Sequence, residues 1–337
     1  MKKNSPITIL LCSLLSAGVV TSALFLHYFF RMKKNIAAER IHSRQFPVMG
    51  TAGKITLYNV EESDVVRVMD GVQEIFYHVE KLCSIFNPES ALYRINASAE
   101  KKAIPCPEEL FTLLEECSYF HKISSGAFDV SIRPLMLLWG FYRKRNTLPD
   151  EKALRETLDV TGFDKVVLDR KNHTVSFRKK GVSLDLGGIA KGYALDLGAA
   201  FLRKEGVKKF VLDLGGNLFC FNENTADEPF RIGIRSPENP HRIVKTIFLR
   251  NGAIATSGDY ERYVWIGGKR YTHIMDPRTG KPVSGIHGVT VLTPRGLDSD
   301  VYSTMIFVLG KVPAEIPPGT KVWIFKENKV ETTGAAE

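Results

Sequence analysis

The sequence predicts an α+β fold: a single compact domain with a mostly antiparallel sheet and flanking helices, preceded by an N-terminal transmembrane helix. Three observations support this prediction. An uncharged apolar run stands near the N-terminus, amphipathic segments with helical spacing follow up to residue 160, and short strand-like segments predominate after residue 165. Strands and helices that occupy separate parts of a chain are typical of α+β domains. No linker-like segment divides residues 46–337, so we expect one domain there.

The first 34 residues (1–34) are predicted to anchor the chain in a membrane. Ile7–Phe30 contains no Asp, Glu, Lys or Arg, and basic residues flank it on both sides. A run of this length spans a bilayer as a helix, whereas a cleaved signal peptide has a shorter apolar region before a small-residue cleavage site. We expect an uncleaved anchor, with cleavage near Thr21–Ala23 as the alternative. Residues 35–45 are predicted to form a polar spacer with helical character.

The distribution of charge excludes nucleic acid as a partner. The chain carries 46 basic and 37 acidic residues, a formal net charge of +9, but five basic residues and no acidic ones lie in residues 1–34. The excess of positive charge left in the domain is too small for a nucleic-acid footprint. The basic flanks of the anchor suit anionic lipid headgroups instead.

Cysteine spacing argues against a zinc site or a thioredoxin-like redox centre, because no Cys-x-x-Cys pair occurs. The four cysteines outside the anchor either form disulfides, for which three full pairings exist, or are buried free thiols, and the sequence does not choose between the two. The four cysteines outside the anchor are Cys83, Cys106, Cys117 and Cys220.

Periodicity predicts the elements in order. Gln45–Asn59 is a strand pair or one long strand, centred on Met49-Gly50-Thr51. Apolar residues at helical spacing predict helices at Asp64–Phe86, Pro107–Ser124, Leu148–Val160, Ile189–Glu205 and Ser299–Leu309. Strand character is predicted at Lys165–Leu168, Thr174–Arg178, Gly181–Leu186, Phe210–Leu214, Phe230–Arg235, Lys245–Leu249, Ile254–Ser257, Tyr263–Ile266, Val289–Leu292 and Val322–Phe325. Leu-Asp-Leu-Gly-Gly occurs at both 184–188 and 212–216, which predicts a strand–helix–strand unit with a matching turn after each strand.

The segment Ser183–Ala194 carries the strongest chemical signal. Asp185 ends an apolar strand, Gly187 and Gly188 form the turn, and Lys191 lies in the first turn of the next helix. A turn without side chains lets backbone N–H groups approach a charged ligand, and the helix N-terminus and Lys191 add positive charge. This combination suits a phosphate or pyrophosphate, with Asp185 holding a cation or the rest of a nucleotide. A loop with a structural aspartate is the alternative.

Asp300 and Thr304 lie four residues apart, so a helix presents both on one face. A carboxylate and a hydroxyl are hard oxygen ligands, and magnesium completes such a set with water and phosphate oxygens. The alternative is that Asp298, Ser299 and Asp300 only cap the helix.

Two further clusters carry polar residues with more than one interpretation. His273 has the pKa range of a general base, and a packed strand histidine is the alternative. Asp276–Gly280 has the composition of a tight turn, and Asp129 is either a ligand or a cap. The chain lacks a P-loop, the Rossmann glycine spacing and a Gly-x-Ser-x-Gly elbow. The residues alone thus predict a pyrophosphate-type ligand, a divalent cation and an extracytoplasmic location.

Seven motifs occur in series between Met49-Gly-Thr51 and Phe307-Val-Leu-Gly310: Ser84–Asn96, Gly126–Asp129, Pro134–Phe141, Asp185–Tyr193, Thr256–Gly258, His273–Gly280 and Asp300–Thr304. In this order they resemble the FAD:protein FMN transferase family, also called the ApbE family. The resemblance covers nearly all of the chain after the anchor. It implies that residues 46–337 form an ApbE-like, T-fold-like flavin transferase domain.

The resemblance also implies an activity and its residues. Such enzymes bind FAD and a divalent cation, usually magnesium (Mg²⁺), and transfer FMN to a threonine hydroxyl of a target flavoprotein while AMP leaves. Phosphoryl transfer of this kind requires charge neutralisation at the pyrophosphate. The implied metal ligands are the backbone oxygen of Gly188, Asp300 and Thr304, and His273 resembles the base. The implied FAD contacts are Met49, Phe86, Ala127, Phe128, Asp129, Asp185, Lys191 and Ile274.

A target in a membrane redox complex is expected, with the anchor in the inner (cytoplasmic) membrane and the catalytic domain on the periplasmic side. Two departures from the family pattern stand out. Phe86 replaces a tyrosine of many relatives, which removes a hydroxyl contact but keeps a ring for stacking. Asp298 makes the start of the metal helix more polar, as an added ligand or as a cap. The alternative functions are magnesium-dependent FAD hydrolysis to FMN and AMP, and non-enzymatic flavin carriage at the membrane.

Overall fold

The computed structural model describes residues 39–333, except residues 144, 146, 240 and 328. The predicted anchor and residues 35–38 of the predicted spacer lie outside these residues. Within the part of the chain that is described, no helix combines the length and the apolar character needed to cross a membrane. Residues His42–Glu337 make up one compact unit by their internal contacts.

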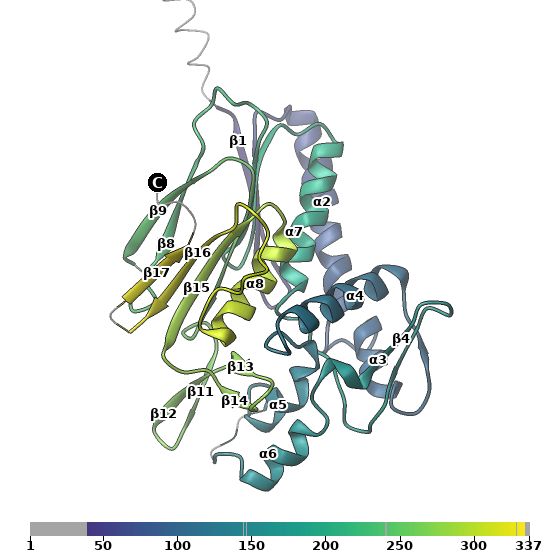
Figure 1. Ribbon diagram of the computed structural model, residues 1–337. Helices are drawn as coiled ribbons and strands as arrows, with labels where there is room; N and C mark the ends of the chain where they lie inside the picture. The colour runs from purple at the N-terminus through teal and green to yellow at the C-terminus, as the bar shows by residue number, and fades with distance from the viewer. Residues whose placement is uncertain (1–38, 144, 146, 240, 328, 334–337) are drawn as a thin grey trace, which may run out of the picture. The chain divides into compact units, whose positions relative to one another are not determined.

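An eight-stranded sheet is the centre of the domain (Figure 1). The pairs β2–β6, β7–β10 and β15–β16 are antiparallel, as predicted. The strands, in their order across the sheet, are β1 (Ile41–Val48), β2 (Thr51–Tyr58), β6 (Lys209–Leu214), β7 (Asn217–Asn222), β10 (Gly252–Gly258), β15 (Ile286–Thr293), β16 (Lys321–Lys326) and β17 (Lys329–Thr333).

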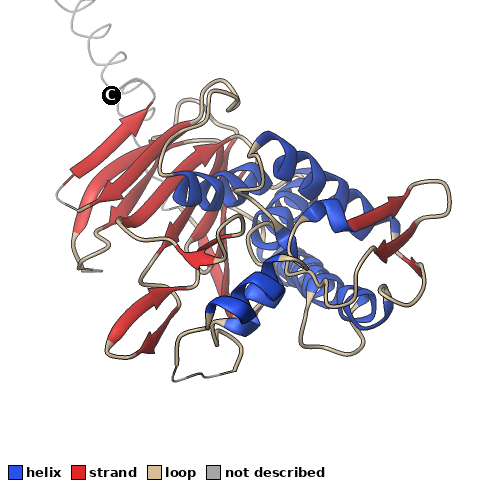
Figure 2. Ribbon diagram, turned by 60° about the horizontal axis from the view of Figure 1, so that its bottom comes forward, coloured by secondary structure: helices blue, strands red, loops and turns tan. Residues whose placement is uncertain are grey.

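Helices gather on one side of this sheet (Figure 2). α7 packs between α2 and α8, and α8 also contacts β10 and β15. The helices are α2 (Glu62–Cys83), α3 (Ala91–Ser98), α4 (Glu108–Ile123), η1 (Val130–Ile132), α5 (Arg133–Leu138), α6 (Glu151–Leu158), η2 (Phe163–Lys165), α7 (Ala190–Lys204) and α8 (Gly296–Leu309).

Smaller sheets complete the domain. They are the three-stranded sheet of β3 (Ile104–Pro105), β5 (Thr174–Phe177) and β4 (Val166–Asp169), and the pairs β8 (Phe230–Arg235) with β9 (Ile243–Leu249), β11 (Tyr263–Ile266) with β12 (Lys269–Thr272), and β13 (Met275–Asp276) with β14 (Lys281–Pro282).

Both faces of the main sheet are buried. Alternate residues of β16 belong to different apolar clusters: Val322 and Ile324 join the large core under the helices, whereas Trp323 and Phe325 join a cluster with Ile247 of β9. This two-sided burial explains why β16 is apolar at four consecutive positions instead of alternating with polar residues.

Most predicted elements are present, with bounds that shift by a few residues. The strand predicted at Gly181–Leu186 is wrong, because Val182–Leu186 is extended but pairs with no strand among the described residues. The side-chain amide of Asn96 replaces a strand partner: its Nδ2 donates to the carbonyl of Leu184 at 2.9 Å, and its Oδ1 accepts from the same residue's N–H at 2.7 Å. A further part of the predicted spacer, Ile41–Gln45, belongs to β1.

The two Leu-Asp-Leu-Gly-Gly turns differ. Gly215 and Gly216 have φ angles of 61° and 92° in the tight β6–β7 turn, which is the left-handed region that favours glycine. Gly187 and Gly188 are absent from the positive-φ residues and lead into α7. The matched turns predicted from the repeated sequence are therefore not matched in the structure.

Each cysteine in the described part of the chain is buried and free, which is one of the two alternatives left open: Cys83, Cys106, Cys117 and Cys220.

Candidate active site

Asp185 precedes the glycine turn and is held by it. The Oδ1 atom of Asp185 accepts a hydrogen bond from the backbone N–H of Gly187 at 2.8 Å, which folds the turn back over the carboxylate. The hydroxyl of Tyr142 donates to the other carboxylate oxygen. Burial and the negative charge of Asp185 both raise the pKa of Tyr142, so this phenol stays protonated and remains a donor.

Tyr142 also connects Asp185 to Phe86. The two rings meet edge to face with centroids 5.7 Å apart, and 71% of Phe86 is exposed. An aromatic side chain this exposed, held by one ring partner, offers a free face for stacking. The sequence motifs did not single out Tyr142, which follows the apolar segment ending at Trp139 and precedes basic residues.

Asp300 lies where α7 and α8 cross. Only 3% of the residue is exposed. Its Oδ2 accepts from the backbone N–H of Gly192 at 3.0 Å, and its Oδ1 accepts from Nδ2 of Asn217 at 2.8 Å. Asp300 therefore accepts a hydrogen bond from one of the N–H groups in the first turn of α7 that have no partner within the helix. The helix dipole favours a carboxylate at this position.

The opposite contact is made by Asp196 of α7. Its two carboxylate oxygens accept from the backbone N–H groups of Gly296 and Leu297, at 2.6 and 2.9 Å, in the first turn of α8. Each helix thus caps the other with an aspartate that stands four residues after a glycine. A Cβ on Gly192 would lie 2.2 Å from the carbonyl oxygen of Gly296, so the two backbones touch and tolerate no side chain there.

The structure tests the capping alternative for the start of α8. The helix begins at Gly296, and no side chain of its own caps it. Asp300 lies in its second turn and so does not cap α8. The cap role predicted for Asp298 is wrong, because its carboxylate makes no cap hydrogen bond and lies 3.6 Å from the guanidinium of Arg295. Its role as an added ligand stays a prediction.

The structure places Gly188, Asp300 and Thr304, the residues predicted to bind the metal, close to one another. The hydroxyl of Thr304 lies one turn after Asp300, within 3.4 Å of the carbonyl oxygen of Asp300 and 3.2 Å of the Ser257 hydroxyl. A Cβ built on Gly188 would lie 3.5 Å from the Thr304 hydroxyl oxygen, so the glycine turn faces this part of α8 directly. A carboxylate, a hydroxyl and a backbone carbonyl are hard oxygen donors, the chemistry that magnesium requires.

This oxygen set is incomplete on its own. The described residues contain no group of three or more His, Cys, Asp and Glu side chains able to hold a metal ion. A magnesium ion bound with so few protein ligands takes its remaining ligands from water and substrate phosphates. The donor set therefore fits a cation that arrives with a phosphate ligand.

Lys191 lies at the same place. Its Nζ is 3.6 Å from Oδ1 of Asp300, and 28% of its side chain is exposed. The lysine was predicted to face a pyrophosphate. In the structure it pairs with the candidate metal carboxylate, so a positive charge already stands beside the turn.

His273 is held by one backbone carbonyl. Both its N–H and its ring Nδ1 lie 3.0 Å from the carbonyl oxygen of Arg262. Only an Nδ1–H tautomer donates to a carbonyl, which leaves the lone pair on Nε2. Burial lowers the pKa of His273 to about 4, and the positive charges of Arg262 and Lys191 act in the same direction. The imidazole is therefore neutral near pH 7 and able to accept a proton.

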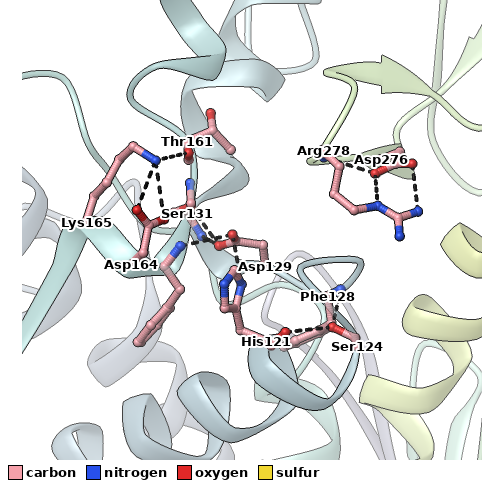
Figure 3. Close-up of polar contacts among 12 residues, drawn as sticks. His121, Ser124, Phe128, Asp129, Ser131, Thr161, Asp164, Lys165, Asp276 and Arg278 are labelled. Atoms are coloured by element: carbon pink, nitrogen blue, oxygen red, sulfur yellow. Dashed lines mark hydrogen bonds and ion pairs between the residues drawn. The ribbon is translucent and has the colours of Figure 1, made fainter.

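The loop before η1 is ordered by Asp129 (Figure 3). The carboxylate accepts from the N–H and hydroxyl of Ser131 at 2.8 and 2.7 Å and from the N–H of Phe163 at 3.0 Å, and His121 Nδ1 lies 3.1 Å away. Only 2% of this side chain is exposed. The carboxylate of Asp129 therefore caps η1, as the second alternative expected. Its hydrogen bonds fix the loop that contains Ala127 and Phe128.

Phe128 is the residue of this loop that contacts the glycine turn. A Cβ on Gly188 would lie 3.4 Å from the Phe128 ring, and Phe128 is 3% exposed. Ala127 is buried beside it. Gly126 faces the side chains of His121 and Arg278, and Arg278 is fixed by two hydrogen bonds to Asp276, at 2.8 and 2.9 Å. The predicted tight turn at Asp276–Gly280 is confirmed.

The remaining predicted contacts come from two turns. Met49 has a φ of 52° in the β1–β2 turn, and its N–H donates to Glu80 at 2.8 Å. A Cβ on Gly50 would lie 3.5 Å from the Arg262 guanidinium, so this turn adjoins the segment that holds His273. Ile274 is 6% exposed and packs in the large core.

Comparison with known proteins identifies the family. The ApbE family model matches residues 49–316. This chain belongs to the ApbE family. The resemblance inferred from the seven motifs is confirmed, and so is the prediction that the chain is an enzyme of the transferase class.

ApbE relatives align over most of the chain. An FAD:protein FMN transferase of Klebsiella pneumoniae (strain 342) is 31% identical over 273 residues, 80% of this chain and 83% of that protein. The protein of the same name from Treponema pallidum (strain Nichols) is 30% identical over 318 residues, 88% of each chain.

Solved ApbE structures share the fold. The ApbE protein of Thermotoga maritima has a TM-score of 0.79 at 30% identity, covering 87% of this chain and 96% of that one. The flavin transferase ApbE from Vibrio cholerae has a TM-score of 0.75 at 26% identity, covering 87% and 97%.

Proposed function

We propose that this chain transfers the FMN half of FAD to a threonine hydroxyl of a target protein, in a magnesium-dependent reaction that releases AMP. One observation carries the proposal: Gly188, Asp300 and Thr304 converge beside Lys191, although the glycine turn and α8 are far apart in sequence. Family membership and the relatives' shared name support the flavin substrate and the protein acceptor.

The residues divide the work at the pyrophosphate. Lys191 and the N–H groups at the start of α7 supply positive charge for the phosphates. Gly188, Asp300 and Thr304 would hold magnesium, which supplies further charge neutralisation when bound. Asp185, Phe86 and Phe128 border the turn and are placed to contact the rest of the dinucleotide.

His273 acts on the acceptor. Its Nε2 accepts the proton of the threonine hydroxyl as the threonine oxygen forms a bond to the FMN phosphorus. The phosphoanhydride bond between that phosphorus and the AMP phosphate breaks, and AMP leaves with the electron pair. One phosphoester is formed for one anhydride broken, and the proton rests on His273 until solvent removes it.

The location of the reaction is part of the proposal. We propose that Ile7–Phe30 anchors the chain in the inner membrane and that the domain works on the periplasmic side, on a subunit of a membrane redox complex. The apolar run and its basic flanks support the anchor.

Intact-mass analysis of flavoproteins co-expressed with and without this chain tests the activity. With the chain, an acceptor gains the mass of FMN less one water, and the purified chain releases AMP from FAD only with acceptor and magnesium present. Hydrolysis to FMN and AMP without any acceptor adduct would identify the pyrophosphatase alternative, and intact FAD throughout would identify a carrier.

Asp300→Asn tests the role of the carboxylate. It keeps the size of the side chain but removes the charge that magnesium requires, so transfer is expected to fall at least a hundredfold, a common cost for one charge-stabilising group. Asp213→Asn is the matched control, because Asp213 is also shielded and holds a glycine turn through the N–H of Gly216 at 2.8 Å. Equal activity of the two variants would remove Asp300 from the mechanism.

A further inference from the structure

The β11–β12 hairpin is fixed to the domain by one face. Val264 and Tyr271, directly opposite each other in the pair, pack with buried Ile266 against Trp139 and Met275. Trp139 in turn donates from its indole N–H to the carbonyl of Gly280 at 2.8 Å. The hairpin projects beyond the main sheet (Figure 1), and these contacts fix its base to the domain.

The other face of the hairpin is aromatic and exposed. Trp265 is 62% exposed and Tyr263 46%, with ring centroids 6.3 Å apart. Arg270, opposite Trp265 in the register, lies over the Tyr263 ring at 5.4 Å. Tryptophan, tyrosine and arginine are the residues most enriched at the energetic centres of protein interfaces. No apolar cluster of the described domain includes Trp265.

The hairpin and the candidate base form one unit. β12 ends at Thr272, and His273 is the next residue. The residue before β11 is Arg262, whose carbonyl holds both the N–H and the ring of His273. A polypeptide bound to the hairpin would therefore lie next to His273, the residue proposed to accept the proton of the threonine hydroxyl.

The charges on this unit are mainly positive. Arg262, Lys269 and Arg270 are exposed, against Glu261 and the shielded Asp259, which already pairs with Arg270 at 2.9 Å. A partner with carboxylates suits this surface. Among the described strands, β11 and β12 pair only with each other, which leaves their outer edges open to an extended segment.

We propose that the exposed face of the β11–β12 hairpin is the docking surface for the acceptor protein, and that it takes an extended, acidic segment carrying the acceptor threonine. This inference rests on the proposed function. It assigns the acceptor to Tyr263, Trp265 and Arg270, separate from the dinucleotide at the glycine turn.

Trp265→Ala tests the surface in the full-length chain. The probe is the acceptor that gains FMN in the co-expression experiment, purified without flavin. The variant is expected to raise the KM for this acceptor about tenfold or more, while the affinity for FAD with magnesium stays unchanged. Phe248→Ala is the matched control, because Phe248 is equally exposed at 64% but lies on β9. It is expected to leave both quantities unchanged.

Fluorescence supplies a second readout. The chain has three tryptophans, and Trp139 and Trp323 are buried at 7% and 5% exposure, so acrylamide quenching reports on Trp265. Acceptor without FAD should protect Trp265 from quenching, and an acceptor peptide whose carboxylates are changed to amides should protect it less.

Failure of the inference differs from failure of the proposed function. If the wild-type chain transfers FMN while Trp265→Ala has an unchanged KM, or if the acceptor leaves quenching unchanged, the docking surface is refuted and the transferase stands. If the wild-type chain modifies no acceptor, the transfer proposal fails and the docking proposal fails with it.

Discussion

At the scale of single residues, the sequence was informative where a motif kept its ligands close together in the chain. Asp300 and Thr304 were predicted from their spacing, and their meeting with Gly188 is present in the structure. Tyr142 and Asn217 were missed, because their contacts join segments more than 40 residues apart and no local pattern marks them. Asp129 was predicted as a ligand or a cap; its carboxylate caps η1 in the structure, and its contact with FAD stays a prediction.

The pH dependence of transfer follows from His273. Its pKa of about 4 predicts that the base stays neutral in mildly acidic solution, so kcat/KM for the acceptor should keep its value through pH 6.5 and lose half only near pH 4. The pH–rate profile of the wild-type chain checks this, with circular dichroism to show where acid unfolding begins. An acidic limb with its midpoint near 6.5 would contradict it.

The lowered pKa of His273 also makes the free energy of unfolding depend on pH. The folded chain holds the His273 proton more weakly than the unfolded chain, whose histidine titrates near 6.5. Its contribution is therefore fully present above pH 6.5 and is lost as the pH falls from 6.5 towards 4.

At the scale of elements, periodicity predicted the long helices well, and failed where a segment is held by side chains. Val182–Leu186 has a strand-like pattern because it is buried, but Asn96 satisfies its backbone. α3 was missed because its eight residues are too few for a clear helical repeat. The sequence did not predict the mutual capping of α7 and α8, because the aspartate that caps each helix lies on the other one, about 100 residues away.

Asp196→Ala tests this capping. It leaves the first N–H groups of α8 without their acceptor, so we expect a loss of about 1–2 kcal/mol in the free energy of unfolding. Because α8 carries Asp300, the magnesium concentration for half-maximal transfer should also rise. Urea denaturation and magnesium titration measure the two effects.

Asp150→Ala is the control for Asp196→Ala. Asp150 caps α6 through the N–H of Ala153 at 2.8 Å, and α6 carries no candidate ligand. A comparable loss of stability with an unchanged magnesium requirement is expected. If both variants shift the magnesium requirement equally, the effect of Asp196 is not specific to α8.

At the scale of the whole molecule, the α+β class and the antiparallel sheet were predicted from the strand pattern. The order of the strands was not, because β2–β6 and β10–β15 pairing depends on contacts distant in sequence. The anchor at Ile7–Phe30 stays a prediction, since it lies outside the described residues. The four described cysteines lie inside the domain, although only Cys220 belongs to the main sheet.

The thiols should therefore resist modification until the domain unfolds. Burial raises the pKa of Cys83, Cys106 and Cys220 to about 12, and that of Cys117 well above its usual value. Since the thiolate is the reactive form, N-ethylmaleimide should label none of the four in the native chain and all of them in urea. Peptide mass spectrometry reads each site, and native labelling at any of them would contradict this burial.

The crossing of α7 and α8 has one more consequence. Gly192 and Asp196 on one helix mirror Gly296 and Asp300 on the other, so the junction has an approximate internal two-fold symmetry. Sliding either helix along its axis breaks both carboxylate contacts together and drives backbone into backbone. The two carboxylate contacts are therefore coupled, so that a substitution at Asp196 changes the site through the position of α8, which carries Asp300.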